Sequence, residues 1–223
     1  MASQLDLEEQ EQLAELKHFW KTYGNLISWL LIIVLGAYAA WNGWQYWERS
    51  QSAKASALYD EVEKAVTAND VARVERSLAD MKDKFGSTHF AHQAGLLAAR
   101  QLYTQGKVDQ AKAILGWVAD SAPTPALKDV ARLRLAALLW EGKALDEALK
   151  QLGAPFTPEM GALAADLRGD VLQAKGQTAE AVAAYQQAWK QLPATSDYRR
   201  MVQAKLGALG VQVSAESGAA AAK

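Results

Sequence analysis

The side chains that could perform chemistry in this sequence are few, and their spacing does not assemble a catalytic or metal site. His89 and His92 are three residues apart near the start of an expected helix, a spacing that could place two imidazoles on one metal ion. The chain has no cysteine, and no acidic residue stands at a spacing that defines a third ligand. We therefore interpret both histidines as surface or capping residues beside Ser87 and Thr88.

Motifs for nucleophilic catalysis and phosphate binding are missing from the sequence. It contains no G-x-S-x-G, no Walker loop and no H-E-x-x-H. Glu61 and Glu63 fall on different sides of a helix, so we interpret them as solvated charges. A net charge of −1 argues against nucleic acid as a partner, because such binding needs a basic face. These observations predict a protein that is not an enzyme, holds no metal or cofactor, and acts through binding surfaces.

A long apolar segment near the N-terminus indicates where this protein works. No residue from Leu26 to Trp41 is charged. The apolar stretch continues to Trp47, and its length of about 22 residues is enough to cross roughly 30 Å of hydrocarbon. Aromatic residues gather at both of its ends, as they do where a membrane helix meets water. The residues expected to anchor the chain are Leu26, Trp29, Leu30, Trp41, Trp44 and Trp47.

A cleaved signal peptide is the alternative reading of this segment, because Ala37-Tyr38-Ala39 has the small-x-small form of a cleavage site. The region before it is long and acidic, whereas secretory signals begin short and positive, so retention as an anchor is favoured. Flanking positive charges are nearly balanced and do not set the orientation. A short first segment, one anchor and a large C-terminal body favour the tail inside and the body outside, which in a bacterium is the periplasm.

Repeated turns follow the anchor and predict the fold. GKVDQA at 106–111, GKALDEA at 142–148 and GQTAEA at 176–181 begin with glycines 36 and 34 residues apart. The last unit has the spacing of a tetratricopeptide repeat, a helix-turn-helix of about 34 residues. The middle unit departs from it, with an extra residue before Ala148 and a second helix that stops at Gly153. A weaker unit covers 57–85, with Asn69-Asp70 at its turn. The residues expected to pack the repeats are Ala99, Gly106, Ala111, Gly142, Ala148, Gly169, Gly176 and Ala181.

The sequence therefore predicts an all-α protein with four parts. These are an acidic cytoplasmic tail (1–24), a transmembrane helix (25–47), a periplasmic tetratricopeptide-like solenoid of α-hairpins (48–210) and a disordered tail (211–223). A generic stack of α-hairpins without repeat ancestry is the alternative, and it would change the function little.

In such a stack the first helices of the hairpins line the concave face, so their free sides are the expected contact surface. These positions are Gln93, Leu96, Arg100, Tyr103, Asp129, Arg132, Leu139, Trp140, Leu163, Asp166, Asp170 and Gln173. Tyr103 and Trp140 are the favoured anchors, because aromatic side chains often carry interface energy. The alternative for Trp140, that it packs between hairpins, stays open.

Three stretches resemble one known family. EEQEQLAELKHFWKTYGN at 8–25, GWQYWERSQ at 43–51 and FGSTHFAHQAGLLAARQLYTQGKVDQA at 85–111 are similar to the ancillary subunit of the bacterial SecYEG translocon. The resemblance covers essentially the whole chain. It implies a single-pass inner-membrane adaptor that binds SecYEG and a membrane-anchored periplasmic chaperone of the prolyl-isomerase-like type, with translocating polypeptides as further partners. A membrane-anchored scaffold for envelope or cell-division assembly is the alternative function.

Overall fold

The computed structural model describes residues 7–213, and within that range every regular element is an α-helix. The chain divides into two compact units, which meet between Gln51 and Ser52 within the first helix, α1 (Leu7–Thr67). The fold class predicted from the sequence, a single apolar N-terminal helix followed by helical hairpins, is confirmed.

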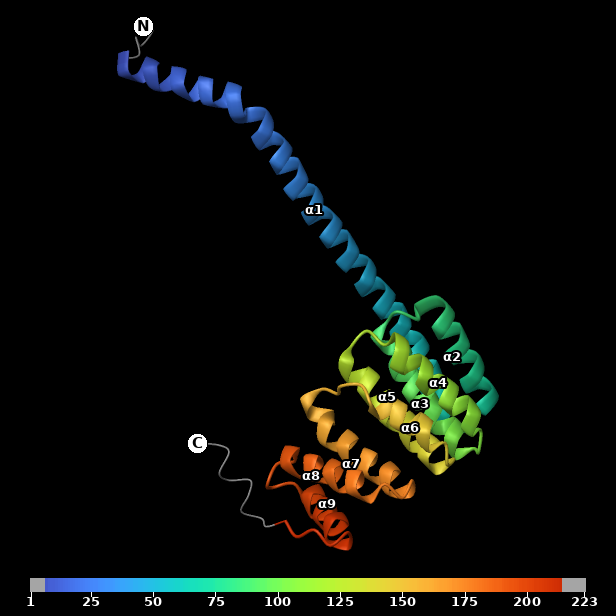
Figure 1. The fold of residues 1–223 in the computed structure, drawn as a ribbon. Coiled ribbons are helices and arrows are strands. Elements are labelled where there is room, and N and C mark those ends of the chain that lie inside the picture. Colours follow the sequence, from blue (N-terminus) through green and yellow to red (C-terminus); the bar gives the residue numbers. More distant parts are fainter. Residues whose placement is uncertain (1–6, 214–223) are drawn as a thin grey trace. The chain divides into compact units, whose positions relative to one another are not determined.

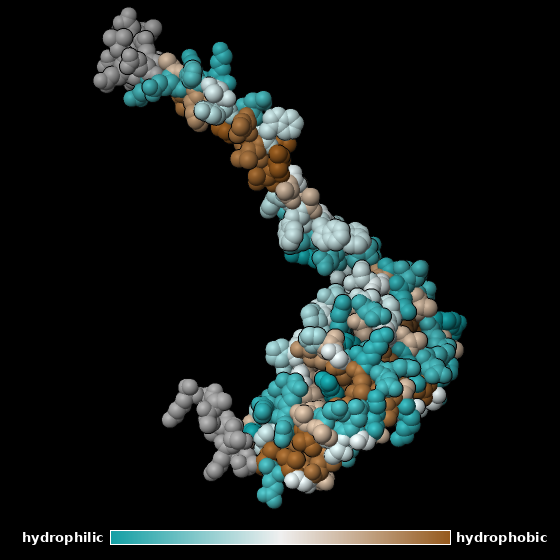
Figure 2. All heavy atoms as spheres, viewed as in Figure 1, coloured by the Kyte–Doolittle hydropathy of each residue, from teal (hydrophilic) through white to brown (hydrophobic). Residues whose placement is uncertain are grey.

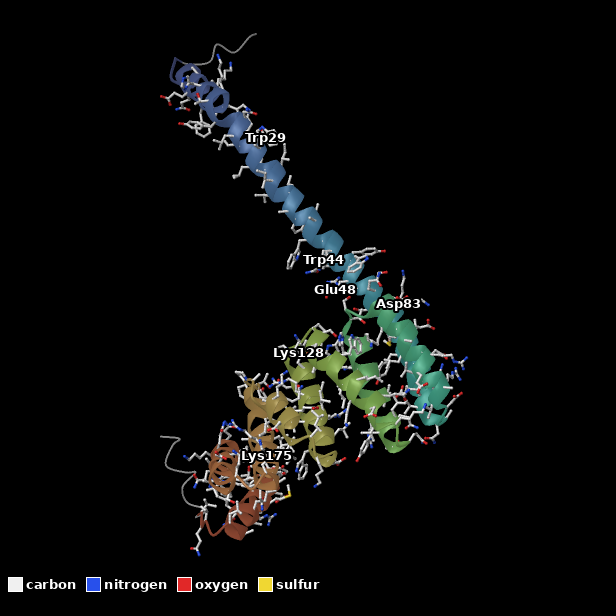
Figure 3. The ribbon with its side chains drawn as sticks, turned by 45° about the vertical axis from the view of Figure 1, so that its right-hand side comes forward. Trp29, Trp44, Glu48, Asp83, Lys128 and Lys175 are labelled. Atoms are coloured by element: carbon white, nitrogen blue, oxygen red, sulfur yellow. The ribbon has the colours of Figure 1, made fainter. Side chains whose placement is uncertain are left out.

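The first unit contains the apolar part of α1. Figure 2 shows this part as a brown band on the helix, preceded by polar residues. The five side chains from Leu31 to Leu35 are between 53% and 64% exposed, and almost none of the apolar stretch is buried in the unit. Trp29 and Trp44 project from α1, and the charged residue Glu48 follows them (Figure 3). By length and composition this helix can cross a membrane.

The second unit is a series of antiparallel hairpins (Figure 1). The last turns of α1 pair with α2 (Val71–Phe85), and α3 (His89–Thr104) pairs with α4 (Val108–Ser121). The next pairs are α5 (Pro125–Glu141) with α6 (Leu145–Leu152) and α7 (Pro158–Ala174) with α8 (Thr178–Gln191). The last helix in the described range is α9 (Asp197–Ala208). As the sequence predicts, the second helix of the third hairpin is short and ends before Gly153.

Three apolar clusters fill the spaces between these hairpins. The first joins the end of α1 to α2 and α3, the second runs from α3 to α7, and the third joins α7, α8 and α9. Val211 and Val213 pack against the third cluster, so the packed domain continues to residue 213, beyond the predicted boundary at 210. The rest of the predicted tail, 214–223, lies outside the described residues, as do residues 1–6.

The same turn follows each first helix of a hairpin, and it follows α9 as well. In each turn one residue adopts a left-handed conformation, with φ between +53° and +79°. These residues are Asn69, Gly106, Lys143, Gly176 and Gly210. The next backbone N–H donates to the carbonyl five positions earlier, as Lys107 does to Leu102 at 2.9 Å. This pair of features is the Schellman motif, which satisfies the free carbonyls at a helix end. The accepting residues, Ala65, Leu102, Leu139, Leu172 and Leu206, are all buried.

The middle turn corrects the predicted register. Gly142, the glycine that begins the predicted turn, has φ −75°, and Lys143 after it adopts the left-handed conformation. Lys143 precedes the buried Ala148 by five residues, the spacing that also separates Gly106 from Ala111 and Gly176 from Ala181. The expected extra turn residue is therefore absent. The small residue of this unit is Ala136, which is fully buried seven positions before Lys143.

Small residues seven positions before the left-handed residue of a turn let the paired helices approach closely. A Cβ atom added to Gly169 would lie 2.4 Å from the Tyr185 ring, a distance that real Cβ atoms do not reach. Tyr185 is fully buried, so its ring cannot move aside without opening the core.

We expect Lys143→Gly to stabilise the protein. A left-handed conformation costs an L-residue about 1 kcal/mol, and glycine is free of that cost. The free energy of unfolding should therefore rise by about 1 kcal/mol, or roughly 2–4 °C in Tm for a domain of this size. Gly106→Ala at the equivalent turn is the matched control and should lower the Tm by a similar amount. Thermal unfolding followed by circular dichroism measures both. A Tm that falls for Lys143→Gly would contradict the assigned register.

Candidate protein-binding surface

The predicted contact residues differ widely in exposure. The prediction that they share a free face is wrong for Leu96, Asp129, Leu139 and Asp166, which are all buried. Arg100, Tyr103, Leu163 and Gln173 are exposed, and Gln93, Arg132, Trp140 and Asp170 are partly buried. The physical reason is that first helices in a stack contact neighbours on several sides, which leaves only a narrow free stripe.

Asp129 and Arg132 hold an irregular loop. The Asp129 carboxylate accepts the backbone N–H of Thr157 at 2.7 Å, just before α7 begins. The Arg132 guanidinium donates to the carbonyls of Gln151 and Ala154 at 2.8 Å and of Pro155 at 3.0 Å. Arg132 also lies 4.0 Å from the centre of the Phe156 ring. These contacts satisfy backbone groups that the early end of α6 leaves free, so both residues are structural.

Asp166 and Asp170 belong to a second internal network. Lys205 from α9 lies 2.8 Å from Asp166 Oδ2 and 2.7 Å from Asp170 Oδ1. The Tyr185 hydroxyl lies 2.7 Å from Asp170 Oδ1 and 2.9 Å from Gln173 Oε1. Burial, followed by the hydrogen bond to Asp170, raises the pKa of Tyr185 far above its usual range. This network ties α7 to α8 and α9, so the two carboxylates are occupied within the domain.

Trp140 also packs within the domain. Its ring is partly buried and contacts the second apolar cluster, and its carbonyl accepts the N–H of Lys143 at 2.9 Å. The Trp140 ring is therefore used, at least in part, in packing against the core. Tyr103 is the aromatic residue of the predicted set that stays exposed, at 40%.

A groove between α3 and α5 contains Arg100 and Tyr103, two of the four exposed residues of the predicted surface. Its volume is about 380 Å³, and its lining residues are Ala99, Arg100, Tyr103, Leu115, Arg134, Ala137, Leu138 and Glu141. We call it the α3–α5 groove. The Tyr103 hydroxyl donates to Glu141 Oε2 at 2.9 Å, and this hydrogen bond raises the pKa of Tyr103. Burial and the nearby charge of Arg100 lower the pKa of Arg134. An apolar floor with charged groups around it suits a polypeptide segment.

Sequence reasoning found Arg100 and Tyr103 but missed the α5 side of this groove. The register error at Gly142 explains part of the omission. Ala137 precedes the left-handed Lys143 by the same number of residues as Arg100 precedes the left-handed Gly106. Ala137 is therefore the α5 equivalent of Arg100, and it lines the groove. The buried small residue Ala136 is the signal that would have corrected the count.

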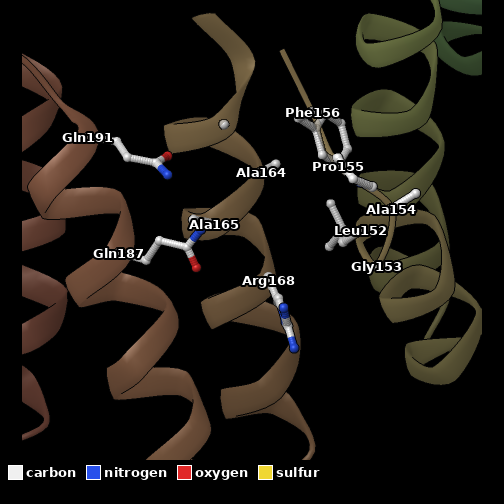
Figure 4. Close-up of a pocket in the computed structure, with 11 residues that line it drawn as sticks. Leu152, Gly153, Ala154, Pro155, Phe156, Ala164, Ala165, Arg168, Gln187 and Gln191 are labelled. Atoms are coloured by element: carbon white, nitrogen blue, oxygen red, sulfur yellow. The ribbon is translucent and has the colours of Figure 1, made fainter. Parts of the chain in front are cut away.

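A second groove, of about 340 Å³, lies beside the irregular loop and was not predicted from the sequence. Figure 4 shows Phe156 and Pro155 of the loop on one side, and Gln187 and Gln191 of α8 on the other. Arg168 from α7 lines the same groove. The Arg132 guanidinium lies against the Phe156 ring, so the shape of this groove depends on the contacts of Asp129 and Arg132 that hold the loop.

The interpretation of His92 as a surface or capping residue is wrong. Its side chain is fully buried and stacks on Trp117, with ring centres 4.5 Å apart. Nδ1 lies 2.8 Å from the carbonyl of Thr88, so it carries the proton and donates, and Nε2 lies 3.1 Å from Ser121 Oγ. His89 is exposed. His92 therefore connects α3 to α4, and its nitrogen atoms are occupied within the hairpin.

A stack of helical hairpins joined by Schellman turns defines a helical-repeat protein. A sequence model described as a tetratricopeptide repeat-like domain matches residues 17–211. Proteins named ancillary SecYEG translocon subunit are similar to this chain. The one from Neisseria gonorrhoeae is 31% identical over 91% of this chain and 98% of its own length. Those from Escherichia coli and Haemophilus influenzae are 29% and 28% identical, over 91% and 82% of this chain and 97% and 89% of their own lengths.

The chain belongs to the ancillary SecYEG translocon subunit family, whose tetratricopeptide repeat-like domain covers most of it. The resemblance seen in the sequence is confirmed. No solved structure matches the chain.

We expect His92 to make the stability of the protein depend on pH. Burial lowers the pKa of His92 below its ordinary value of 6.5, while the hydrogen bond to Thr88 opposes this shift. The unfolded chain then binds a proton more readily than the folded one. The stabilisation from neutral His92 is complete above pH 6.5 and is lost as the pH falls through the lowered pKa.

Urea unfolding of wild type and His92→Gln at pH 7.5 and 5.5 tests this expectation. The drop in unfolding free energy between the two values should be smaller in His92→Gln, because the remaining drop comes from other groups. The exposed His89→Gln serves as the matched control and should keep the wild-type drop. Equal drops in all three proteins would show that His92 is not the group responsible.

Proposed function

We propose that this protein is a non-enzymatic adaptor of the SecYEG translocon, held in the bacterial inner membrane by α1. The observation that carries the proposal is the match to proteins named for that role over almost the full length of both chains. The family match begins at residue 17, so it includes the apolar part of α1 together with the hairpin domain.

The apolar segment supports membrane attachment by its exposure. A row of leucine, isoleucine and valine side chains that finds no partner in its own unit needs a hydrocarbon environment or another apolar helix. In this proposal the N-terminus is cytoplasmic and the hairpin domain is periplasmic. Attachment also raises the effective concentration of the domain near emerging chains, so that weak binding is sufficient.

The α3–α5 groove is the proposed contact site for polypeptides. Tyr103 offers an aromatic surface, Ala99, Ala137 and Leu138 offer an apolar floor, and Arg100 can pair with an acidic residue. We propose that it engages translocating polypeptides or the membrane-anchored periplasmic prolyl-isomerase-like chaperone that receives them. The domain would then bring SecYEG and that chaperone together.

We expect the full-length protein to stay with the membrane after alkaline carbonate extraction. Ile33→Arg with Val34→Arg should release it, because each arginine at the centre of a span costs about 2.5–3.5 kcal/mol. Ala53→Arg with Ala57→Arg adds the same charge to exposed positions after the apolar segment and should not release it. Immunoblotting of pellet and supernatant gives the result. Protease added outside spheroplasts should digest the hairpin domain, and protection of that domain would contradict the proposed orientation.

We expect a photo-crosslinker at position 103 to capture translocon subunits or the periplasmic chaperone in intact membranes. Arg100→Glu in the same protein should reduce the yield several-fold, because it reverses the charge beside the groove. A crosslinker at the exposed Asp120 of α4 is the matched control and should give little product. Mass spectrometry identifies the partners. Capture of division or wall-synthesis proteins in their place would favour an envelope scaffold and contradict the adaptor function.

A further inference from the structure

A small pocket between the end of α8 and the start of α9 has an unusual set of lining groups. Its volume is about 100 Å³, and it is lined by Trp189, Ala194, Ser196, Arg199, Arg200 and Gln203. None of these residues lines the α3–α5 groove or the groove beside the irregular loop. The polar groups of Trp189, Arg199 and Arg200 can only donate hydrogen bonds. The pocket is therefore rich in donors.

Two of these donors are buried, and neither has an acceptor among residues 7–213. Arg199 is 6% exposed, and its Nε atom has no hydrogen-bond partner. The Nε1 atom of Trp189, which is 5% exposed, also has none. Buried polar groups are nearly always hydrogen-bonded, because an orphan donor loses its water without replacement. Two orphan donors in one pocket point to a missing acceptor.

The charge of Arg199 strengthens this argument. Within residues 7–213 Arg199 forms no ion pair, and its guanidinium lies 4.1 Å from the centre of the Trp189 ring. The aromatic face offsets part of the cost of burying the cation, but it accepts no hydrogen bond from Nε. The neighbouring acid, Asp197, pairs with Arg200 and not with Arg199. Among the described residues, this buried positive charge therefore has no anionic partner.

The start of α9 adds to the positive field. Ser196 precedes the helix, and its side chain makes no capping hydrogen bond, so free backbone N–H groups lie at this end. A volume of about 100 Å³ is below the roughly 300–1,000 Å³ of sites for whole small molecules. The pocket suits one planar anionic group, and a carboxylate matches the guanidinium fork.

We propose that this pocket binds a carboxylate group from a polypeptide. Glu216 of the same chain is one source, because it follows Val213 by three residues and lies outside the described range. Three residues span at most about 10 Å. Gln203, which lines the pocket, donates to the Val213 carbonyl at 3.1 Å, so the chain leaves the described structure beside the pocket. An acidic side chain of a bound polypeptide is the other source.

The test follows the indole N–H resonance of Trp189 in the full-length protein, labelled with 15N-tryptophan in detergent and assigned with Trp189→Phe. The probe is N-acetyl-glutamate amide, and N-acetyl-glutamine amide is the uncharged control. If Glu216 fills the pocket, Glu216→Gln alone moves the resonance, and the glutamate probe binds that variant more tightly than wild type. If a partner polypeptide supplies the carboxylate, Glu216→Gln leaves the resonance in place, and the probe moves it equally in both proteins.

Either result supports a carboxylate site and identifies its source. Arg199→Gln should weaken the probe at least tenfold, since it removes a charge-assisted hydrogen bond. Arg200→Gln at the rim gives a second, milder variant in case Arg199→Gln fails to fold, and it should weaken the probe several-fold. The exposed Arg168→Gln on α7 is the matched control and should bind like wild type. A Trp189 resonance that responds neither to Glu216→Gln nor to the glutamate probe beyond the glutamine control would overturn the proposal.

Discussion

The hairpin domain depends on one backbone conformation that recurs at the end of each first helix. A left-handed residue at Asn69, Gly106, Lys143 or Gly176 ends the helix and lets the chain reverse. The following N–H returns to a carbonyl whose residue is buried, which joins the turn to the core. Because the turn is the same each time, a buried residue always follows five positions later and a buried one precedes it by seven. This constraint sets how consecutive helices face each other, and thereby where the grooves form.

Polar networks take over where that regular pattern ends. The loop after α6 cannot satisfy its own backbone, so Asp129 and Arg132 reach across from α5 to do so. At the end of the stack, Lys205 of α9 is held by Asp166 and Asp170 of α7. Buried charges are tolerated in both places because each has an opposite charge or several carbonyls around it. Arg199 stands apart from these two networks, which is why its pocket is notable.

The two units serve separate physical needs. The apolar part of α1 exposes hydrocarbon side chains and requires a membrane or a partner helix, whereas the hairpin domain buries its apolar groups in three clusters. The grooves on the domain are consequently small, and their linings mix apolar and charged side chains. The α3–α5 groove with Tyr103 and Arg100, and the groove beside the irregular loop with Phe156, are two examples.

The sequence by itself determined the apolar helix, the helical hairpins, their turns at Asn69, Gly106 and Gly176, and the early end of α6. These features depend on local composition and on spacing of a few residues, which can be read along the chain. Only the tertiary structure decided that Lys143 replaces glycine at the third turn, since a lysine in that conformation is held there by the surrounding hairpin. The tertiary structure also decided which polar residues of the first helices stay exposed to solvent and which are paired inside the domain. Asp129, Asp166 and Arg100 are all charged residues of first helices, but Asp129 and Asp166 are buried and bind partners 28 and 39 residues away, while Arg100 remains exposed. Pairings over such distances depend on how whole hairpins stack, and no local pattern encodes them.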